Sequence, residues 1–294
     1  MRLLVVMPSY GDLSTASEIF SEICLLAPRK FEIECVVIDE SLGADVFWEE
    51  RPNLRVIQPP FRLGAQSALV EYFRTDSEFL DNFDLVCTLD SDGEDEPSDV
   101  WRLCTSHDEN IDISIATRIS RTNTAAFKLG YAVFKILYRV ATGLPLKSGS
   151  FAIVRAKWLK KNIYRSEFSF SYTGAILSLP ATKKFIPCKR GARRKGLSKM
   201  KTIESVIDGL RIMLPQAGRI AARSFVLLVA ASVFWVIGIA IVLAYKITNS
   251  ASPGWATSFI VLLTVVIGFA LNLTVGALAI FAIVRKDYLG KDKL

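Results

Sequence analysis

Short runs of apolar residues recur through the first 190 residues of the chain, and several are separated by segments with helical spacing. The runs favour strands because they are short and rich in β-branched and aromatic residues: "RLLVVM", "FEIECVVID", "LRVIQ", "FDLVCTLD", "DISIAT", "FAIVRA" and "KKFIPC". Helix-like segments include Ser14 to Leu26, Gly64 to Arg74 and Thr124 to Thr142. Strands alternating with helices predict an α/β fold with a mostly parallel sheet covered on both faces.

Two longer runs near the C-terminal end have a different pattern, because neither contains a charged residue. Ser224 to Tyr245 is 22 residues long and would make a helix of about 33 Å, which is enough to cross a bilayer core. The second run, Trp255 to Val284, is longer still. The polar, turn-forming stretch "KITNSASPG" joins them. We therefore predict a transmembrane hairpin with helices at about 224–246 and 255–284.

The distribution of basic residues predicts the orientation of this hairpin. The loop between the runs holds only Lys246, whereas both outer flanks are basic: Arg211, Arg219 and Arg223 before the first run, and Arg285, Lys286, Lys291 and Lys293 after the second. The positive-inside rule then places both termini and the long N-terminal region in the cytoplasm. The predicted organisation is a cytosolic domain at 1–200, a juxtamembrane segment at 201–223, and a membrane domain at 224–294 with a basic tail.

The juxtamembrane segment 201–223 mixes apolar and basic residues at helical spacing and is broken by Pro215. One interpretation is a pair of amphipathic helices on the membrane surface, and the other is an ordinary linker with one buried stripe. We favour the first, because the segment adjoins a predicted span and carries Arg219 and Arg223 four residues apart.

Composition narrows the possible chemistry. The five cysteines, Cys24, Cys35, Cys87, Cys104 and Cys188, are scattered and form no C-x-x-C, which predicts reduced core residues. The single histidine, His107, lies in the polar segment "TSHDEN" and is expected on the surface, so histidine triads and histidine-rich metal sites are excluded. The net charge of +7 is concentrated near the predicted membrane and in "KRGARRKGLSK". This placement favours a membrane surface or a phosphorylated ligand over nucleic acid.

An acidic stretch, "LDSDGEDEP", follows the predicted fourth strand and holds five carboxylates within seven residues, Asp90 to Glu96. A solvated turn would explain it, but the D-x-D spacing of Asp90 and Asp92 at a strand end also suits Mg²⁺ or Mn²⁺, which bind one or two carboxylates together with substrate phosphates. Polar turns also follow the first two strands, as "PSYGD" and "DES". Since ligands bind beyond the carboxyl ends of parallel strands, the three turns predict a nucleotide pocket. Neither a G-x-G-x-x-G nor a P-loop motif is present.

The order of these motifs resembles the family 2 glycosyltransferases that charge polyprenyl phosphates, including dolichyl-phosphate mannose synthase and bacterial polyprenyl-phosphate glucosyltransferases. The resemblance rests on "MPSYGD", "VVIDES", "RLGAQSAL", "LDSDGEDEP", "IATRISR", "KSGSFAIVRA" and "RRKGLSK", followed by two apolar spans. It implies a GT-A fold and the transfer of a sugar from a nucleotide diphosphate to a lipid phosphate.

The resemblance also assigns roles to residues. It implies that the nucleotide sugar is bound by Pro8, Tyr10, Asp12, Asp39, Glu40, Gln66, Asp90, Arg193, Ser198 and Lys199. The metal would be held by Asp90, Asp92 and Glu94, and the catalytic set would be Asp90, Asp92, Asp95 and Arg118. The acceptor phosphate would meet Arg118, Lys128, Arg219 and Arg223. Fixed cations and a divalent ion suit this chemistry, because a diphosphate leaving group needs its charge neutralised.

The sequence departs from the family at one position that concerns the catalytic base. Relatives often carry Gly-Asp-Phe where this chain has Gly149-Ser150-Phe151. A phosphate monoester has a second pKa of about 6 and is largely an anion at neutral pH, so the departure puts a dedicated base in doubt but not the reaction. Glu40 in place of Asp, and Gly11-Asp12 in place of Asn-Glu, are milder departures that leave the donor undetermined.

The sequence therefore predicts an inverting glycosyltransferase that transfers a sugar from a nucleotide-diphosphate sugar to an undecaprenyl or dolichyl phosphate at the cytoplasmic membrane face, with Mg²⁺ or Mn²⁺. A transferase with another acceptor and a non-catalytic nucleotide-sugar-binding membrane scaffold remain alternatives. The expected partners are the donor, the lipid and the membrane, without nucleic acid, and homo-oligomerisation is left open.

Overall fold

The computed structural model describes residues 1–45, 51–118, 125–147, 150–189, 191, 193–194, 202–247 and 254–291. The chain divides into two compact units, one of Met1–Val133 with Leu146–Pro215 and the other of Phe134–Pro145 with Gln216–Leu294.

The first unit is built on a seven-stranded sheet with the order β3-β2-β1-β4-β6-β5-β7. Its strands are β1 (Arg2–Ser9), β2 (Glu32–Asp39), β3 (Leu54–Ile57), β4 (Leu85–Thr88), β5 (Ile113–Arg118), β6 (Ala152–Arg155) and β7 (Lys183–Cys188). All pairings are parallel except those of β6, which is antiparallel to both β4 and β5. Each strand coincides with one of the apolar runs in the sequence, so the predicted mostly parallel sheet is confirmed.

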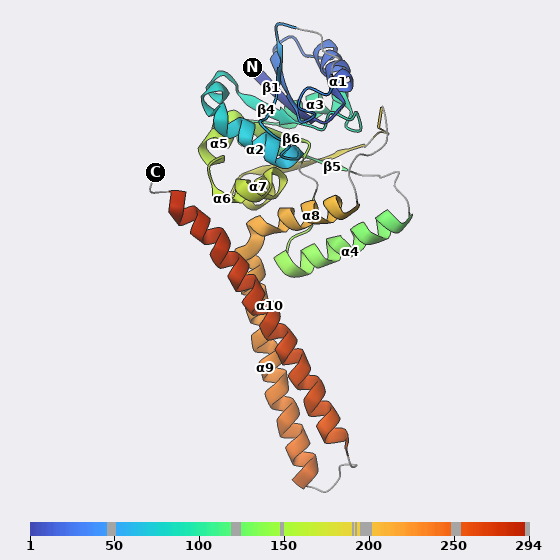
Figure 1. The fold of residues 1–294 in the computed structure, drawn as a ribbon, viewed down its shortest axis with the longest axis vertical. Coiled ribbons are helices and arrows are strands. Elements are labelled where there is room, and N and C mark those ends of the chain that lie inside the picture. The colour runs from blue at the N-terminus through green and yellow to red at the C-terminus, as the bar shows by residue number, and fades with distance from the viewer. Residues whose placement is uncertain are drawn as a thin grey trace. The chain divides into compact units, whose positions relative to one another are not determined.

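Helices cover both faces of this sheet (Figure 1). They are α1 (Leu13–Leu25), α2 (Ala65–Thr75), α3 (Pro97–Ser106), α5 (Ala156–Asn162), α6 (Ser166–Phe170) and α7 (Tyr172–Ser178), with a short 3₁₀ turn, η1 (Ser77–Asn82). A further helix, α8 (Thr202–Met213), packs against α7 rather than against the sheet. Side chains alternate along β1: Leu3, Val5 and Met7 pack with α1 and α3 in one core cluster, and Leu4 and Val6 pack with α2 and α7 in the other. The unit is therefore a three-layer α/β/α sandwich.

The strand register brings several chain segments to one edge of the sheet. Ser9, at the end of β1, pairs with Asp39 at the end of β2. Thr88, at the end of β4, pairs with Ala152 at the start of β6, because β6 runs the opposite way. β5 and β7 are parallel and end together, with Arg118 opposite Cys188. The carboxyl ends of β1, β2, β4, β5 and β7 and the start of β6 consequently share this edge.

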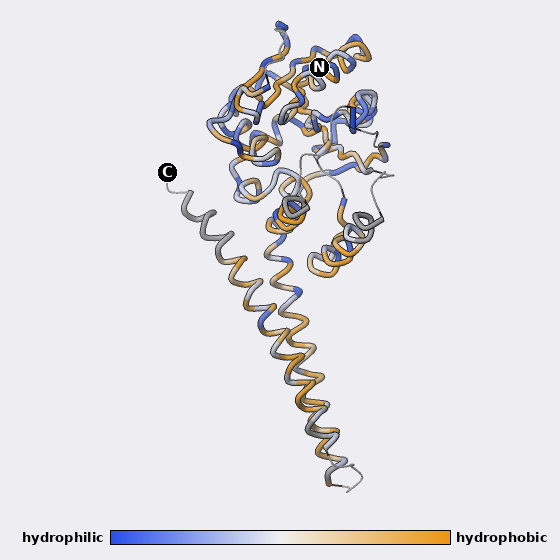
Figure 2. The backbone as a smooth tube through the Cα atoms, turned by 45° about the vertical axis from the view of Figure 1, so that its right-hand side comes forward, coloured by the Kyte–Doolittle hydropathy of each residue, from blue (hydrophilic) through white to orange (hydrophobic). Residues whose placement is uncertain are grey.

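The second unit holds two long helices, α9 (Ala217–Ile247) and α10 (Trp255–Lys291), and the last turns of α4 (Ala125–Thr142). Apolar residues run along both long helices (Figure 2), and both are long and apolar enough to cross a membrane. The Thr274 hydroxyl of α10 donates to the carbonyl of Ser224 in α9, at 3.0 Å. The break expected at Pro215 lies in a 3₁₀ turn, η2 (Leu214–Gln216), and α9 then continues without interruption into the predicted span.

The structure corrects the prediction for His107, which is not a surface residue. It follows the end of α3 and is only 8% exposed, with Nδ1 3.0 Å from the hydroxyl of Ser114 in β5. Burial, assisted by the nearby charge of Arg155, lowers the pKa of His107 to about 4. The prediction for the cysteines is confirmed: all five are free thiols, and four of them are buried.

Candidate nucleotide-sugar site

The acidic stretch forms a tight loop between β4 and α3. Asp92 Oδ1 accepts a hydrogen bond from the backbone N–H of Glu94 at 3.0 Å, which closes a local turn. Gly93, at the centre of the turn, has φ +78°, a conformation that glycine adopts without strain. Asp90 and Asp92 are half-buried and Asp95 is buried, with 3% exposure. The loop is therefore an ordered part of the sheet edge rather than a loose charged turn.

The basic segment after β7 lies directly on this acidic loop. The N–H of Gly191 donates to the carbonyl of Glu94 at 2.8 Å, and the N–H of Arg194 donates to the carbonyl of Asp92 at 3.1 Å. The side chain of Arg194 crosses Gly93 so closely that a Cβ added to Gly93 would lie 2.4 Å from Arg194 Cγ. Segments about a hundred residues apart in sequence thus form one charged surface.

Two neighbouring arginines connect this surface to α1. Arg193 Nη2 lies 2.6 Å from Asp12 Oδ2, and both side chains are largely buried. Arg194 makes two hydrogen bonds to the carboxylate of Glu22, at 2.5 and 2.8 Å. This pair lowers the pKa of Glu22, because the guanidinium stabilises its charged form. Arg193 and Asp12, both predicted from the sequence, are brought together, whereas sequence reasoning missed the contact between Arg194 and Glu22.

Asp12 is available to Arg193 because another residue caps α1. Asp12 occupies the N-cap position of α1 but makes no side-chain capping bond. The N–H of Leu13 instead donates to Asp45 Oδ2 at 2.9 Å, from the loop after β2. No motif in the sequence marks Asp45, since a cap supplied by a distant loop depends on the tertiary fold.

The carboxylates of Asp39 and Glu40, at the end of β2, accept hydrogen bonds from backbone N–H groups of the loops at this edge. Asp39 is fully buried and accepts hydrogen bonds from the N–H groups of Ser41 and Gly43 and from the side-chain amide of Gln58. Glu40, 4% exposed, accepts from the N–H groups of Leu63 and Gly64, at 3.0 and 2.7 Å. Burial raises the pKa of Glu40, and these donors offset the rise only in part. Contacts of Asp39 and Glu40 with a base or ribose stay predictions.

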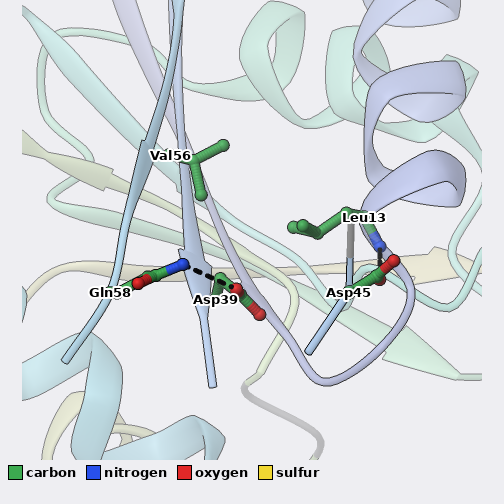
Figure 3. A pocket seen from close by; sticks show the side chains of 5 residues that line it. All are labelled: Leu13, Asp39, Asp45, Val56 and Gln58. Atoms are coloured by element: carbon green, nitrogen blue, oxygen red, sulfur yellow. Dashed lines mark hydrogen bonds between the residues drawn. The ribbon is translucent and has the colours of Figure 1, made fainter. Parts of the chain in front are cut away.

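A cavity of about 390 Å³ opens beside Asp39, between α1 and the ends of β2 and β3 (Figure 3). Its lining combines two apolar side chains with two carboxylates and one carboxamide: Leu13, Val56, Asp39, Asp45 and Gln58. Figure 3 shows Gln58 hydrogen-bonded to Asp39, and Asp45 bonded to the backbone of Leu13. The cavity therefore offers a ligand hydrogen-bonding groups beside a small apolar wall.

Tyr10 and Arg62 form an exposed stacked pair at the same edge. The guanidinium carbon of Arg62 lies 4.1 Å from the centre of the Tyr10 ring, and Tyr10 is 40% exposed. Burial raises the pKa of Glu40, and the charge of Arg62 opposes part of this rise. Sequence reasoning assigned a role to Tyr10 but none to Arg62, although Arg62 is the first residue of the motif "RLGAQSAL".

Three further positions singled out in the sequence, Gln66, Pro8 and Ser150, lie within the described residues. Gln66 accepts hydrogen bonds through Oε1 from the N–H of Thr173 at 2.8 Å and from the hydroxyl of Ser171, so it links α2 to the start of α7. Pro8 is buried within β1. The carbonyl of Ser150 accepts from the Thr88 hydroxyl at 2.9 Å, which places this departure from the family pattern beside the end of β4.

Some residues of the predicted site have side chains that the structure does not describe. The backbone of Arg118 ends β5 at the site edge, but the side chains of Arg118 and Lys128, and the whole of Ser198 and Lys199, lie outside the described residues. Arg219 and Arg223 belong to the second unit, where both are exposed on α9.

A divalent ion at the acidic loop would need ligands from a substrate. Within the described ranges, no group of three or more acidic, histidine or cysteine side chains is arranged to hold an ion alone. Two half-buried aspartates fit Mg²⁺ or Mn²⁺ bound together with phosphate oxygens, which is the usual arrangement for Mg²⁺. Glu94 as a third ligand stays a prediction.

No family model matches the sequence, and no protein of curated function matches it. The fold does match solved structures of glucosyl-3-phosphoglycerate synthase from Mycobacterium tuberculosis. The complex with Mg²⁺ and uridine-diphosphate has 15% sequence identity and a TM-score of 0.51, over 74% of this chain and 79% of that chain. The complex with Mn²⁺, uridine-diphosphate and phosphoglyceric acid has 15% identity and a TM-score of 0.50, over 74% and 78%.

At this level of identity the likeness concerns the fold. The chain therefore has a GT-A-type glycosyltransferase fold, as predicted, with two additional apolar helices at its C-terminal end.

Proposed function

We propose that this protein transfers a sugar from a nucleotide-diphosphate sugar to a polyprenyl phosphate at the cytoplasmic face of a membrane. The observation that carries the proposal is the meeting of the acidic loop, 90–95, with the arginines 193 and 194 at the carboxyl edge of a GT-A-type sheet. The two apolar helices in the same chain supply a reason for a lipid-borne acceptor.

The donor would lie across this edge. Its base would enter the cavity beside Asp39 and Gln58, with Tyr10 and Arg62 at the exposed side. Its diphosphate would lie between the acidic loop and Arg193. The solved neighbours contain uridine-diphosphate with Mn²⁺ or Mg²⁺, which supports a metal-dependent nucleotide donor.

Each group of residues then has a defined task. A divalent ion bound at Asp90 and Asp92 would neutralise charge on the departing diphosphate. Arg193 would add a fixed cation to the same charge, and the segment holding it is positioned by backbone bonds to the acidic loop. These interactions strengthen as the bond between the sugar and the diphosphate breaks, so they favour the transition state over the ground state.

The acceptor would react by a single displacement. An oxygen of the lipid phosphate attacks C1 of the sugar, the bond from C1 to the diphosphate breaks, and the nucleoside diphosphate leaves. The configuration at C1 inverts, so an α-linked donor gives a β-linked product. A phosphate monoester oxygen is largely ionised at neutral pH, which is consistent with Ser150 where relatives carry Asp. Arg118, Lys128, Arg219 and Arg223 are proposed to receive the lipid phosphate.

A second candidate is transfer to a small phosphorylated acceptor. One neighbour was solved with phosphoglyceric acid, which also presents a phosphate group. The two bilayer-length helices favour the lipid, because a water-soluble acceptor gives no reason to hold the enzyme at a membrane.

The test uses purified full-length protein in lipid vesicles, with Mg²⁺ or Mn²⁺ and a panel of UDP- and GDP-sugars. One arm contains polyprenyl phosphate and another contains phosphoglyceric acid. Sugar appearing in the lipid phase, with loss of that signal in Asp92→Ala, is the expected result.

Transfer of sugar only to phosphoglyceric acid would contradict the lipid acceptor and support the second candidate, a small phosphorylated acceptor. Binding of a nucleotide sugar without transfer in any arm would favour a non-catalytic scaffold. A lipid-linked product with retained configuration would contradict the single displacement.

A further inference from the structure

The two acidic residues at the end of β2, Asp39 and Glu40, take opposite faces of the sheet. Side chains alternate along a strand: Val37 packs with α1 in one core cluster, and Ile38 packs with α2 in the other. Asp39 continues the side of Val37 and lines the cavity in Figure 3. Glu40 continues the side of Ile38 and reaches the start of α2, and it is not among the described residues that line the cavity. A base bound in this cavity would therefore meet Asp39 without meeting Glu40.

Glu40 holds the loop before α2 through a single carboxylate oxygen. Its side chain is buried, and Oε1 accepts hydrogen bonds from the consecutive N–H groups of Leu63 and Gly64, at 3.0 and 2.7 Å. Gly64 is the N-cap residue of α2, and its φ of +84° with ψ of +142° is a backbone conformation that other residues rarely adopt. Two donors aimed at one buried oxygen determine the course of the chain here, because an N–H group left without an acceptor is costly.

The backbone of Glu40 is bonded on its other side to the turn after β1. Its N–H donates to the carbonyl of Ser9 at 2.8 Å. Tyr10 follows Ser9, and Arg62 precedes Leu63, so each residue bonded to Glu40 is the chain neighbour of one member of the stacked pair. The guanidinium carbon of Arg62 lies 4.1 Å from the centre of the Tyr10 ring. Glu40 thus joins the two loops whose side chains form this pair.

We propose that Glu40 is a positioning residue for the donor, which it affects by holding Tyr10 and Arg62 in their stacked arrangement at the edge where the base is proposed to lie. The proposal rests on the nucleotide site in the proposed function, but not on the lipid acceptor. It replaces the role that the family resemblance implies for Glu40, a direct contact with base or ribose. A guanidinium held flat on an aromatic ring offers a planar, cationic face to a nucleotide.

The length of the Glu40 side chain distinguishes the two roles. Aspartate, the residue that relatives carry here, keeps the carboxylate but is one methylene shorter, so the N–H groups of Leu63 and Gly64 would lie out of hydrogen-bond reach unless the loop moved. Glutamine keeps the length and a carbonyl oxygen that accepts both bonds, and it loses only the charge. Positioning therefore requires the length, whereas direct contact in the manner of the relatives requires the carboxylate.

The test measures the binding of UDP and of GDP, with Mn²⁺, to the full-length protein in detergent by titration calorimetry. The variants are Glu40→Asp, Glu40→Gln, Arg62→Ala and the double variant Glu40→Asp with Arg62→Ala. Glu32→Asp is the matched control, because it makes the same substitution at the other end of β2, where the side chain of Glu32 is 82% exposed. Melting temperatures without nucleotide show that each protein is folded.

We expect Glu40→Asp to weaken the binding of the nucleotide that the unsubstituted protein binds by about tenfold, and Glu40→Gln and Glu32→Asp to stay within about twofold. Arg62→Ala should weaken binding as well. In the Arg62→Ala background, Glu40→Asp should add less than about twofold, because the pair that Glu40 holds is already lost.

Two results would overturn the positioning role and leave the nucleotide site intact. One is the reverse order, with Glu40→Asp binding normally and Glu40→Gln binding weakly, which is expected of a carboxylate that contacts the donor. The other is an equal loss from Glu40→Asp with and without Arg62, which is expected of a structural role independent of the pair. If Glu40→Asp does not fold, Glu40→Gln decides: normal binding supports positioning, and a tenfold loss contradicts it. Binding of neither nucleotide by the unsubstituted protein would instead contradict the proposed function.

Discussion

Arg193 and Asp12 form an ion pair of 2.6 Å between residues 181 positions apart, and both side chains are largely buried. The pair joins the basic segment after β7 to the first turn of the proposed nucleotide site. A diphosphate carries more negative charge than one carboxylate, so a bound donor is expected to compete with Asp12 for Arg193. Binding of the donor should therefore weaken the contact between Arg193 and Asp12.

A double-mutant cycle with Asp12→Asn and Arg193→Gln tests this competition. We expect a coupling energy of about 1–3 kcal/mol in the stability of the protein without nucleotide. With UDP and Mn²⁺ present at saturation the coupling should fall, because Arg193 then contacts phosphate in place of Asp12. Denaturant unfolding of the four proteins in detergent measures both values. An equal coupling with and without nucleotide would contradict the competition.

Two substitutions in the acidic stretch test whether Asp92 acts as a metal ligand or only through its charge. Asp92→Ala should lower sugar transfer by about 10²-fold or more, because it removes a ligand for the ion that stabilises the leaving diphosphate. Glu96→Gln removes a charge immediately after this loop, at an exposed position outside the proposed ligand set, and should leave transfer within about twofold. Initial rates at saturating donor provide the comparison. Equal losses would indicate that the loop acts only through its total charge.

Alanine substitutions at Gly93 and Gly64 distinguish the cost of backbone strain from the cost of a side-chain collision. Both have positive φ, +78° and +84°, but a Cβ at Gly93 would collide with Arg194, whereas a Cβ at Gly64 would meet nothing within 4 Å. Gly64→Ala should cost about 1–3 kcal/mol in unfolding free energy from strain alone, because φ +84° with ψ +142° is a conformation that residues other than glycine rarely adopt. Gly93→Ala should cost more, because Arg194 must move and lose its bonds to Glu22.

A further substitution tests whether the larger loss of unfolding free energy in Gly93→Ala comes from the Arg194 ion pair. In a Glu22→Gln background, where Arg194 has already lost its ion pair, the difference between the two glycine substitutions should shrink. Unfolding free energies of the six proteins give this comparison. If the difference is unchanged, the strain at Gly93 is not transmitted to the Arg194 pair.

The lowered pKa of the buried His107 should make the stability of the protein depend on pH. Its pKa is about 4 in the folded protein and about 6.5 when unfolded, so between these values only the unfolded chain binds the proton. Stability is complete above pH 6.5 and falls as the pH drops towards 4, by up to about 3 kcal/mol. His107→Asn cannot take up the proton and should show a smaller decrease. Melting temperatures of both proteins at pH 7.5 and 5 test this, and identical decreases would exclude His107 as the cause.

Periodicity and apolar runs were sufficient to predict every strand of the sheet and the helices α1 and α2, because β-rich buried runs and amphipathic helices have strong local signals. The reversed direction of β6 could not be predicted, because its sequence, "AIVR", is compatible with either direction. That reversal is what places Ser150 beside the end of β4.

Residues of the candidate site could be predicted where they belong to a sequence motif. They could not be predicted where their role depends on a contact between distant segments of the chain. Asp12, Asp92 and Arg193 were identified from ordered motifs, and the structure brings their segments together. Asp45 and Glu22 could not be found in this way, because each acts through one contact with a residue distant in sequence. His107 was misassigned because its polar neighbours in sequence conceal a buried position against β5.

The place of β6 in the sheet also determines the order in which the protein can assemble during synthesis. β1 to β4 all lie within residues 2–88 and can pair as soon as they leave the ribosome. β5 emerges next but has to wait for β6, which joins it to β4. Until residue 155 emerges, β4 presents an open edge that is prone to wrong pairing. The acidic loop is thus made early, and it acquires its arginine partners only when the segment after β7 emerges.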